Sequence, residues 1–184
     1  MEKTIQEIED EIVDEFSFFE SWQDKYEYII ELGKKLKGYP EDKQTNDHKV
    51  KGCQSSVWLV TDDDDGRIVF KADSDSTIVK GLIALLIRVL NRRTPDEILN
   101  AKLEFIAKTG LQQHLAQTRA NGLSAMIKQM KMYALAYKAK QKKKKMSDKT
   151  EEKITVQESE QVTEQPKEVT EPAEKADKAE LNNA

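Results

Sequence analysis

The sequence is poor in the residues that build cross-linked or metal-rich proteins. It has one cysteine, Cys53, and two histidines among 184 residues. A single cysteine excludes an internal disulfide framework and any cysteine-rich zinc or iron–sulfur site made by one chain. A lone thiol is typical of a reducing compartment. We therefore expect a cytoplasmic protein that binds no metal and no cofactor of its own.

Long apolar runs are also missing. The longest, residues 81–87, is far short of the roughly 20 residues that a membrane-spanning helix needs. The acidic N-terminus lacks the pattern of a secretory signal. The 7 glycines form no phosphate-binding motif, and the chain has no overall basic excess. These absences predict a soluble protein with neither a membrane nor a nucleic acid as its partner.

Charge is distributed unevenly along the chain. Residues 147–184 hold 11 acidic residues and 5 lysines, a balance of −6, so residues 1–146 carry +2 of the total of −4. The C-terminal segment is also nearly free of large apolar residues, and it cannot bury enough surface to offset chain entropy. We therefore expect one domain in residues 1–140. Regular structure should fade at the lysine run, leaving residues 141–184 as a disordered lysine-rich junction and acidic tail.

Helix starts are marked by capping residues. Thr4 with Glu7 forms a capping-box pattern before an apolar stripe, and Ser21 precedes a second stripe in the same way. Thr94-Pro95 begins another helix, and Thr118 is the expected cap of the last one. The segment of residues 77–90 is apolar on most faces, which predicts a helix at the centre of the core.

A hairpin separates the early helices from the central one. Residues 57–60 and 68–70 are rich in β-branched and aromatic side chains, and they flank Asp65-Gly66, a pair that suits a tight turn. The polar stretch before them, residues 41–51, should be a loop that ends as a short strand. The predicted fold is α+β, with a small antiparallel sheet of about three strands packed against several helices.

Cys53 lies in a polar loop, Lys51-Gly52-Cys53-Gln54-Ser55, just before the first strand. The glycine would let a partner approach closely, and Lys51 could favour the thiolate. A buried cysteine acting as a small apolar side chain is an equally good interpretation of these residues alone. A hydrolytic cysteine is disfavoured because it needs a base and an orienting group, and neither His48 nor His114 forms a recognised signature with it. The lysines of residues 138–145 are best explained as a solvated helix end.

The loop and several other segments together resemble the SufE family of sulfur acceptors for iron–sulfur cluster assembly. The resemblance covers roughly residues 10–140 in the family's order and spacing. It is carried by Gly52-Cys53-Gln54-Ser55 and Val57-Trp58, and by the segments at residues 22–33, 73–83, 94–95, 111–115, 118–119 and 121–127.

The resemblance implies a fold shared with iron–sulfur scaffold proteins of the IscU type, and a persulfide carried on Cys53. The partners would be a SufS-like cysteine desulfurase, which holds the PLP, and a downstream scaffold. The protein would have no independent turnover and would be a monomer or weak dimer. Lys51, Gly52, Gln54 and Ser55 would meet the partner, with Asp75, His114 and Arg119 in supporting roles. The alternative is an iron–sulfur scaffold, although one cysteine falls short of the usual four ligands.

The C-terminal segment provides a direct test of the expected domain organisation. Deletion of residues 147–184 should leave the melting temperature almost unchanged, because the segment lacks core-forming side chains. Thermal unfolding followed by circular dichroism measures this. A marked fall in melting temperature would show instead that the segment packs on the domain.

Overall fold

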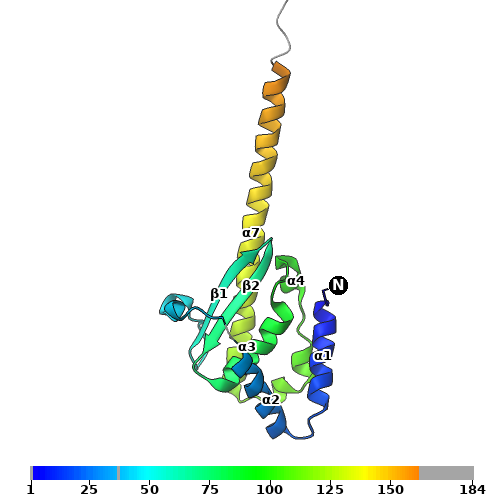
Figure 1. The fold of residues 1–184 in the computed structure, drawn as a ribbon, viewed down its shortest axis with the longest axis vertical. Coiled ribbons are helices and arrows are strands. Elements are labelled where there is room, and N and C mark those ends of the chain that lie inside the picture. Colours follow the sequence, from blue (N-terminus) through cyan, green and yellow to red (C-terminus); the bar gives the residue numbers. More distant parts are fainter. Residues whose placement is uncertain (1, 37, 162–184) are drawn as a thin grey trace, which may run out of the picture. The chain divides into compact units, whose positions relative to one another are not determined.

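In the computed structural model, the backbone is described for residues 2–36 and 38–161, and side chains for the same residues up to 144 and for Met146. The chain divides into two units, Met1–Lys144 and Lys145–Ala184. The first unit is an α+β domain in which helices pack against one face of a hairpin (Figure 1). Among the described residues, no helix combines the length and apolar character that crossing a membrane requires.

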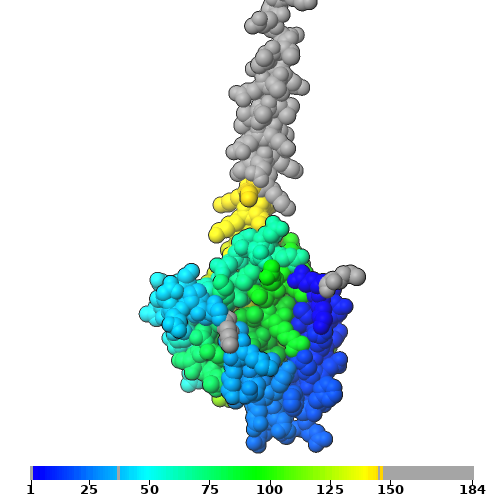
Figure 2. All heavy atoms as spheres, in the orientation of Figure 1, coloured from blue at the N-terminus to red at the C-terminus, as the bar shows by residue number. Residues whose placement is uncertain are grey.

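Two capped helices open the domain. In α1 (Ile5–Ser17), Thr4 and Glu7 form the predicted capping box. In α2 (Trp22–Lys35), the side chain of Ser21 accepts a hydrogen bond from the backbone of Asp24, also as predicted. Figure 2 shows the atoms of these helices, in blue, packed against the green middle part of the chain. Two short 3-10 turns follow, η1 (Glu41–Lys43) and η2 (Asn46–His48).

The sheet has two strands rather than about three. Strands β1 (Val57–Asp64) and β2 (Arg67–Ser74) pair antiparallel, and the Asp65-Gly66 turn has both residues at positive φ, 52° and 80°. The expected preceding strand is reduced to one bridge, between Lys49 and Trp58. The pairing ends there because the chain turns at residues 51 and 52, where Gly52 adopts a φ of +90°. The hairpin lies over α3 and the early part of α7 (Figure 1).

Helix α3 (Thr77–Leu90) is the centre of the core, as the sequence predicted, with nine buried residues. It crosses α2 at two glycines. A Cβ atom added at Gly33 would lie 2.7 Å from the backbone nitrogen of Gly81, and one added at Gly81 would overlap the backbone oxygen of Ile29. Only residues without a side chain allow this approach, so the glycines fix how closely the two helices pack.

The chain then passes through three short helices into a long one. Helix α4 (Pro95–Asn100) begins after Thr94 as predicted, and Thr94 forms a capping box with Glu97. Helices α5 (Phe105–Lys108) and α6 (Leu111–His114) follow. Helix α7 (Gln117–Gln161) starts before Thr118, so Thr118 is not its N-cap.

Helix α7 also continues beyond the point where regular structure was expected to fade. It runs through the lysine run to Gln161, over a sequence rich in the good helix formers Lys, Gln, Glu and Ala. The rest of the predicted tail, residues 162–184, lies outside the described residues.

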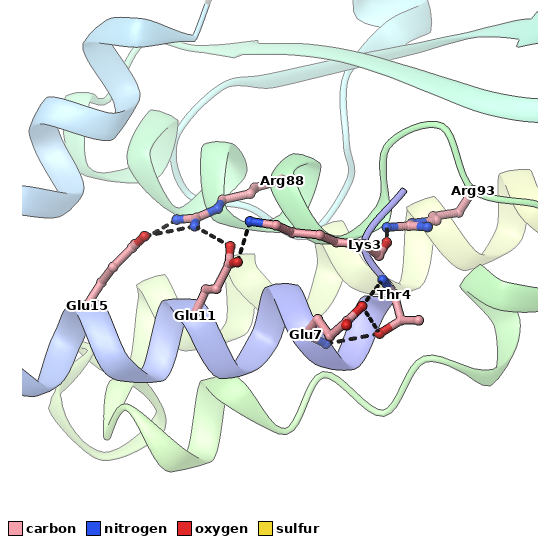
Figure 3. A network of polar contacts seen from close by, with 7 residues as sticks. All are labelled: Lys3, Thr4, Glu7, Glu11, Glu15, Arg88 and Arg93. Atoms are coloured by element: carbon pink, nitrogen blue, oxygen red, sulfur yellow. Dashed lines mark hydrogen bonds and ion pairs between the residues drawn. The ribbon is translucent and has the colours of Figure 1, made fainter. Parts of the chain in front are cut away.

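A polar network joins α1 to α3 at the domain surface (Figure 3). Both guanidinium nitrogens of Arg88 bind the carboxylate of Glu15, at 2.6 and 2.8 Å, and one also reaches Glu11 at 3.3 Å. These hydrogen bonds hold the pKa of Glu15 below its ordinary value. Lys3 pairs with Glu11, and buried Arg93 donates to the backbone oxygen of Lys3. The network therefore anchors the N-terminal segment on the core.

The crossing of α2 and α3 predicts that the free energy of unfolding depends much more on one glycine than on another. Gly81→Ala should lower the free energy of unfolding by about 3 kcal/mol, because the methyl group overlaps rigid backbone. Gly122→Ala, in α7, is the matched control: its Cβ would lie at an ordinary 3.6 Å from the nearest atom. It should be neutral or stabilising by up to about 1 kcal/mol, through helix propensity. Urea unfolding measures both, and equal effects would contradict this account of the crossing.

Candidate functional site

Cys53 lies where the chain turns into the hairpin. Lys51 and Gly52 are exposed in the turn, while the Cys53 side chain points inward and is half-buried. Its Sγ donates a hydrogen bond to the backbone oxygen of Gly122 in α7, at 3.6 Å. The positive φ of Gly52 produces this change of direction. The sequence left exposed and buried thiols as alternatives, and the structure shows an intermediate position.

The thiol borders a small cavity of about 230 Å³, the Cys53 pocket. Three segments far apart in the sequence form it: the loop, the first turns of α3, and the first turns of α7. Its walls combine hydroxyl, amide and aliphatic groups with one guanidinium. The lining residues are Cys53, Gln54, Ser55, Ser76, Val79, Leu82, Ala116, Thr118, Arg119, Gly122, Leu123 and Met126.

The loop after Cys53 is held to the start of α3 by hydrogen bonds. The backbone nitrogen of Ser56 donates to a carboxylate oxygen of Asp75 at 3.0 Å. The hydroxyl of Ser74 donates to the backbone oxygen of Ser56 at 2.8 Å and accepts from the backbone of Ser76. Asp75, expected in a supporting role, thus fixes the loop and does not line the pocket.

Burial controls the protonation of the thiol. Desolvation raises the pKa of Cys53 above its ordinary value, because the thiolate loses hydration in the pocket. Lys51, which was expected to favour the thiolate, is exposed, so water screens its field and burial outweighs it. At neutral pH the resting group is a protonated thiol.

Neither histidine lies in the Cys53 pocket. The ring of His114 stacks on Trp22, with centroids 3.8 Å apart, and its Nδ1 lies 3.0 Å from the backbone oxygen of Gly110. Its backbone oxygen accepts from the hydroxyl of Tyr26. His48 contacts Thr45 within the loop. His114 therefore packs α6 against α2, and the described pocket lining contains no side-chain base that could serve a hydrolytic cysteine.

Arg119, Gln54 and Ser55, three of the residues predicted for the site, line the pocket. Ser76, Thr118 and Gly122 line it too, and the sequence did not single them out for the site. Thr118 and Gly122 were part of the resemblance, and Ser76 was a candidate helix cap, but its side chain makes no capping hydrogen bond. They belong to the site only because they lie close to Cys53 in space, and no local pattern in the sequence indicates that proximity.

The fold and the site together define a class of protein. It is a small α+β domain with one half-buried cysteine, in a loop that lies beside the first turns of two helices, α3 and α7. Comparison with known proteins agrees. The model of the SufE family, described as an Fe-S metabolism associated domain, matches residues 10–134. The chain belongs to the SufE family.

Relatives agree with this assignment, and a solved structure shares the fold. An uncharacterized SufE-like protein of Rhizobium meliloti is 42% identical over 130 residues, which cover 68% of this chain and 93% of the relative. One of Synechocystis is 40% identical over 126 residues, covering 68% and 79%. The solution structure of a hypothetical protein from Thermus thermophilus shares the fold, with a TM-score of 0.60 at 17% identity, covering 72% of this chain and 96% of that one.

The raised pKa of Cys53 predicts slow alkylation of the folded protein. Iodoacetamide reacts with thiolates, so the rate should rise with pH around a higher midpoint in the folded than in the urea-unfolded chain. The unfolded chain loses its proton first as the pH rises, so this group's contribution to stability is lost above its unfolded pKa. Mass spectrometry of the alkylated protein measures both rates. Coincident pH profiles would contradict the sheltered thiol.

Proposed function

We propose that the protein accepts sulfur on Cys53 from the persulfide of a PLP-dependent cysteine desulfurase and passes it on towards iron–sulfur cluster assembly. The observation that carries the proposal is the position of this lone cysteine in a SufE-family domain. Its thiol borders a small pocket, on a loop with exposed neighbours at Lys51, Gly52 and Gln54. Those neighbours offer a docking edge to the desulfurase.

The transfer needs only thiol exchange. Cys53 loses its proton, and its Sγ attacks the outer sulfur of the desulfurase persulfide. A bond forms between Sγ and that sulfur, while the bond between the two desulfurase sulfurs breaks. The desulfurase cysteine leaves as a thiolate and takes up a proton, so the step is balanced without an added oxidant or reductant. The PLP chemistry that first frees the sulfur belongs to the desulfurase.

The pocket supports this role in two ways. Of the described residues that line it, Arg119 alone carries a charge, and its guanidinium can pair with the negative persulfide. The raised pKa of Cys53 keeps the resting thiol protonated and therefore unreactive towards other electrophiles. Docking of the desulfurase must then expose the loop to its persulfide. Removing that persulfide frees the enzyme for its next turnover, which is how the protein stimulates it.

Substitution of Cys53 tests the acceptor role. Incubated with a cognate desulfurase and cysteine, the protein should gain the mass of one sulfur atom and accelerate sulfide release in the presence of a reductant. Cys53→Ser should lose both effects, because a hydroxyl does not attack the persulfide. His48→Gln is the control, since His48 contacts Thr45 outside the pocket. Full stimulation by Cys53→Ser would contradict the proposal, and visible absorbance after anaerobic reconstitution would support the scaffold alternative instead.

A further inference from the structure

A long groove runs along α7 outside the Cys53 pocket. It consists of two hollows, one of about 580 Å³ beside residues 102–115 and one of about 480 Å³ beside Leu99 of α4. Both are lined by Ser124 and Ile127, so they form one continuous surface, the α7 groove. The α7 residues that line it extend from Gln117 to Leu135, about 27 Å at 1.5 Å per residue, which is the length of a five-turn helix.

The groove gives α7 a second apolar face. One face of the helix is buried in the core through Leu123, Met126, Met130 and Ala134. The groove face carries Met132 and Leu135, which are 55% and 60% exposed. Met132 and Leu135 lie three residues apart on one helix face, so they form a contiguous apolar patch, which favours a surface that binds a partner.

The charge of the groove identifies the chemistry of that partner. Three lysines, Lys102, Lys128 and Lys131, line it together with one acid, Glu104. Glu104 already pairs with Lys108 at 3.3 Å. Lys131 is fixed at the groove because its ammonium group donates to the backbone oxygens of Leu99 and Ala101. The hollow beside Leu99 is therefore mainly apolar, and the groove as a whole has a net positive charge.

The net positive charge argues against a second copy of the chain. A two-fold interface brings the same patch of both subunits together, so two surfaces with the same net positive charge would meet there. Like charges at such short range are unfavourable unless something neutralises them. The larger hollow, beside residues 102–115, also fits a rod better than the flat surface of a membrane.

We propose that the α7 groove binds an amphipathic helix of a partner protein, with its apolar stripe on Met132 and Leu135 and its acidic side chains beside Lys128 and Lys131. Such helix-in-groove recognition uses apolar anchors at three- and four-residue spacing. The α7 residues that line the groove, such as Ile127, Lys131 and Leu135, are spaced in the same way. Apart from Leu123, which lines both, the groove and the Cys53 pocket have no lining residue in common. A helix in the groove and a desulfurase at Cys53 therefore contact different residues.

The test uses the full-length protein and a fluorescent synthetic helix of about 18 residues, with leucines at three- and four-residue spacing and glutamates elsewhere. Fluorescence anisotropy should show saturable binding. Leu135→Glu should weaken it by about tenfold or more through loss of an apolar anchor, and Lys128→Glu should weaken it through charge. Phe18→Ser is the matched control, because Phe18 is 82% exposed but does not line the groove. A peptide with lysine in place of glutamate should not bind.

Several results would overturn the proposal. One is a failure of the acidic peptide to bind the wild type. Another is equally tight binding of the peptide by the Leu135→Glu and Phe18→Ser variants while circular dichroism shows that both are folded. Dimerisation that Leu135→Glu abolishes would assign the groove to a second copy. Sedimentation with phosphatidylglycerol vesicles that the same variant abolishes would assign it to a membrane. The Cys53→Ser variant should bind the peptide as the wild type does, so that failure here is distinct from failure of the sulfur-acceptor role.

Discussion

Helices α2 and α3 cross with backbone against backbone, and the rest of the domain is arranged around that contact. Helix axes normally pack about 8–10 Å apart because side chains separate them. At Gly33 and Gly81 no side chain intervenes, and the backbone of Ile29 occupies the space that a Cβ of Gly81 would need. With α3 held in this position, its first turn forms one wall of the Cys53 pocket, and its last turn brings Arg88 to the carboxylates of α1.

The Cys53 pocket depends on three segments meeting, and each is placed by a different interaction. The crossing places the start of α3. Hydrogen bonds from Ser56 and Ser74 tie the loop to that start. The packing of Leu123 and Met126 in the core places the first turns of α7, whose Gly122 oxygen receives the thiol. The site is therefore a consequence of core packing, and a substitution far from Cys53 can alter the exposure of its thiol.

Local signals in the sequence were sufficient for much of the fold. Thr4, Ser21 and Thr94 begin helices because their side chains satisfy backbone groups within three residues, and Asp65-Gly66 turns the hairpin through its own φ preference. The predicted third strand is absent from the sheet. The polar residues 41–51 gave no sign that pairing with β1 stops after a single bridge at Lys49. Regular structure was predicted to fade at the lysine run, whereas α7 extends to Gln161. Composition distinguishes folded from solvated segments better than helix from coil.

The site was predictable only in part, for a related reason. The single thiol and the family resemblance predicted Cys53 and Arg119 as site residues, and both line the pocket. The contact of Cys53 with Gly122 spans 69 positions, and no periodicity or capping rule relates residues so far apart. His114 resembles a site residue in sequence, yet its ring stacks on Trp22 of α2. Its role as packing could be recognised only once α2 and α6 were placed together.

The proposed sulfur-acceptor function places two conflicting requirements on the thiol, and the contacts of the loop offer a way to satisfy both. Nucleophilic attack needs an accessible thiolate, whereas the pocket raises the pKa of Cys53 and half-buries its side chain. The contact between Sγ and Gly122 is a weak hydrogen bond of a thiol to a backbone oxygen, so opening the loop breaks little on that side. The stronger hydrogen bonds join Ser56 to Asp75 and Ser74, next to the start of α3. They lie on the C-terminal side of Cys53, so moving the thiol does not require breaking them. A partner that engages the exposed turn at Lys51 and Gly52 can therefore move the thiol while the hairpin and the core remain in place.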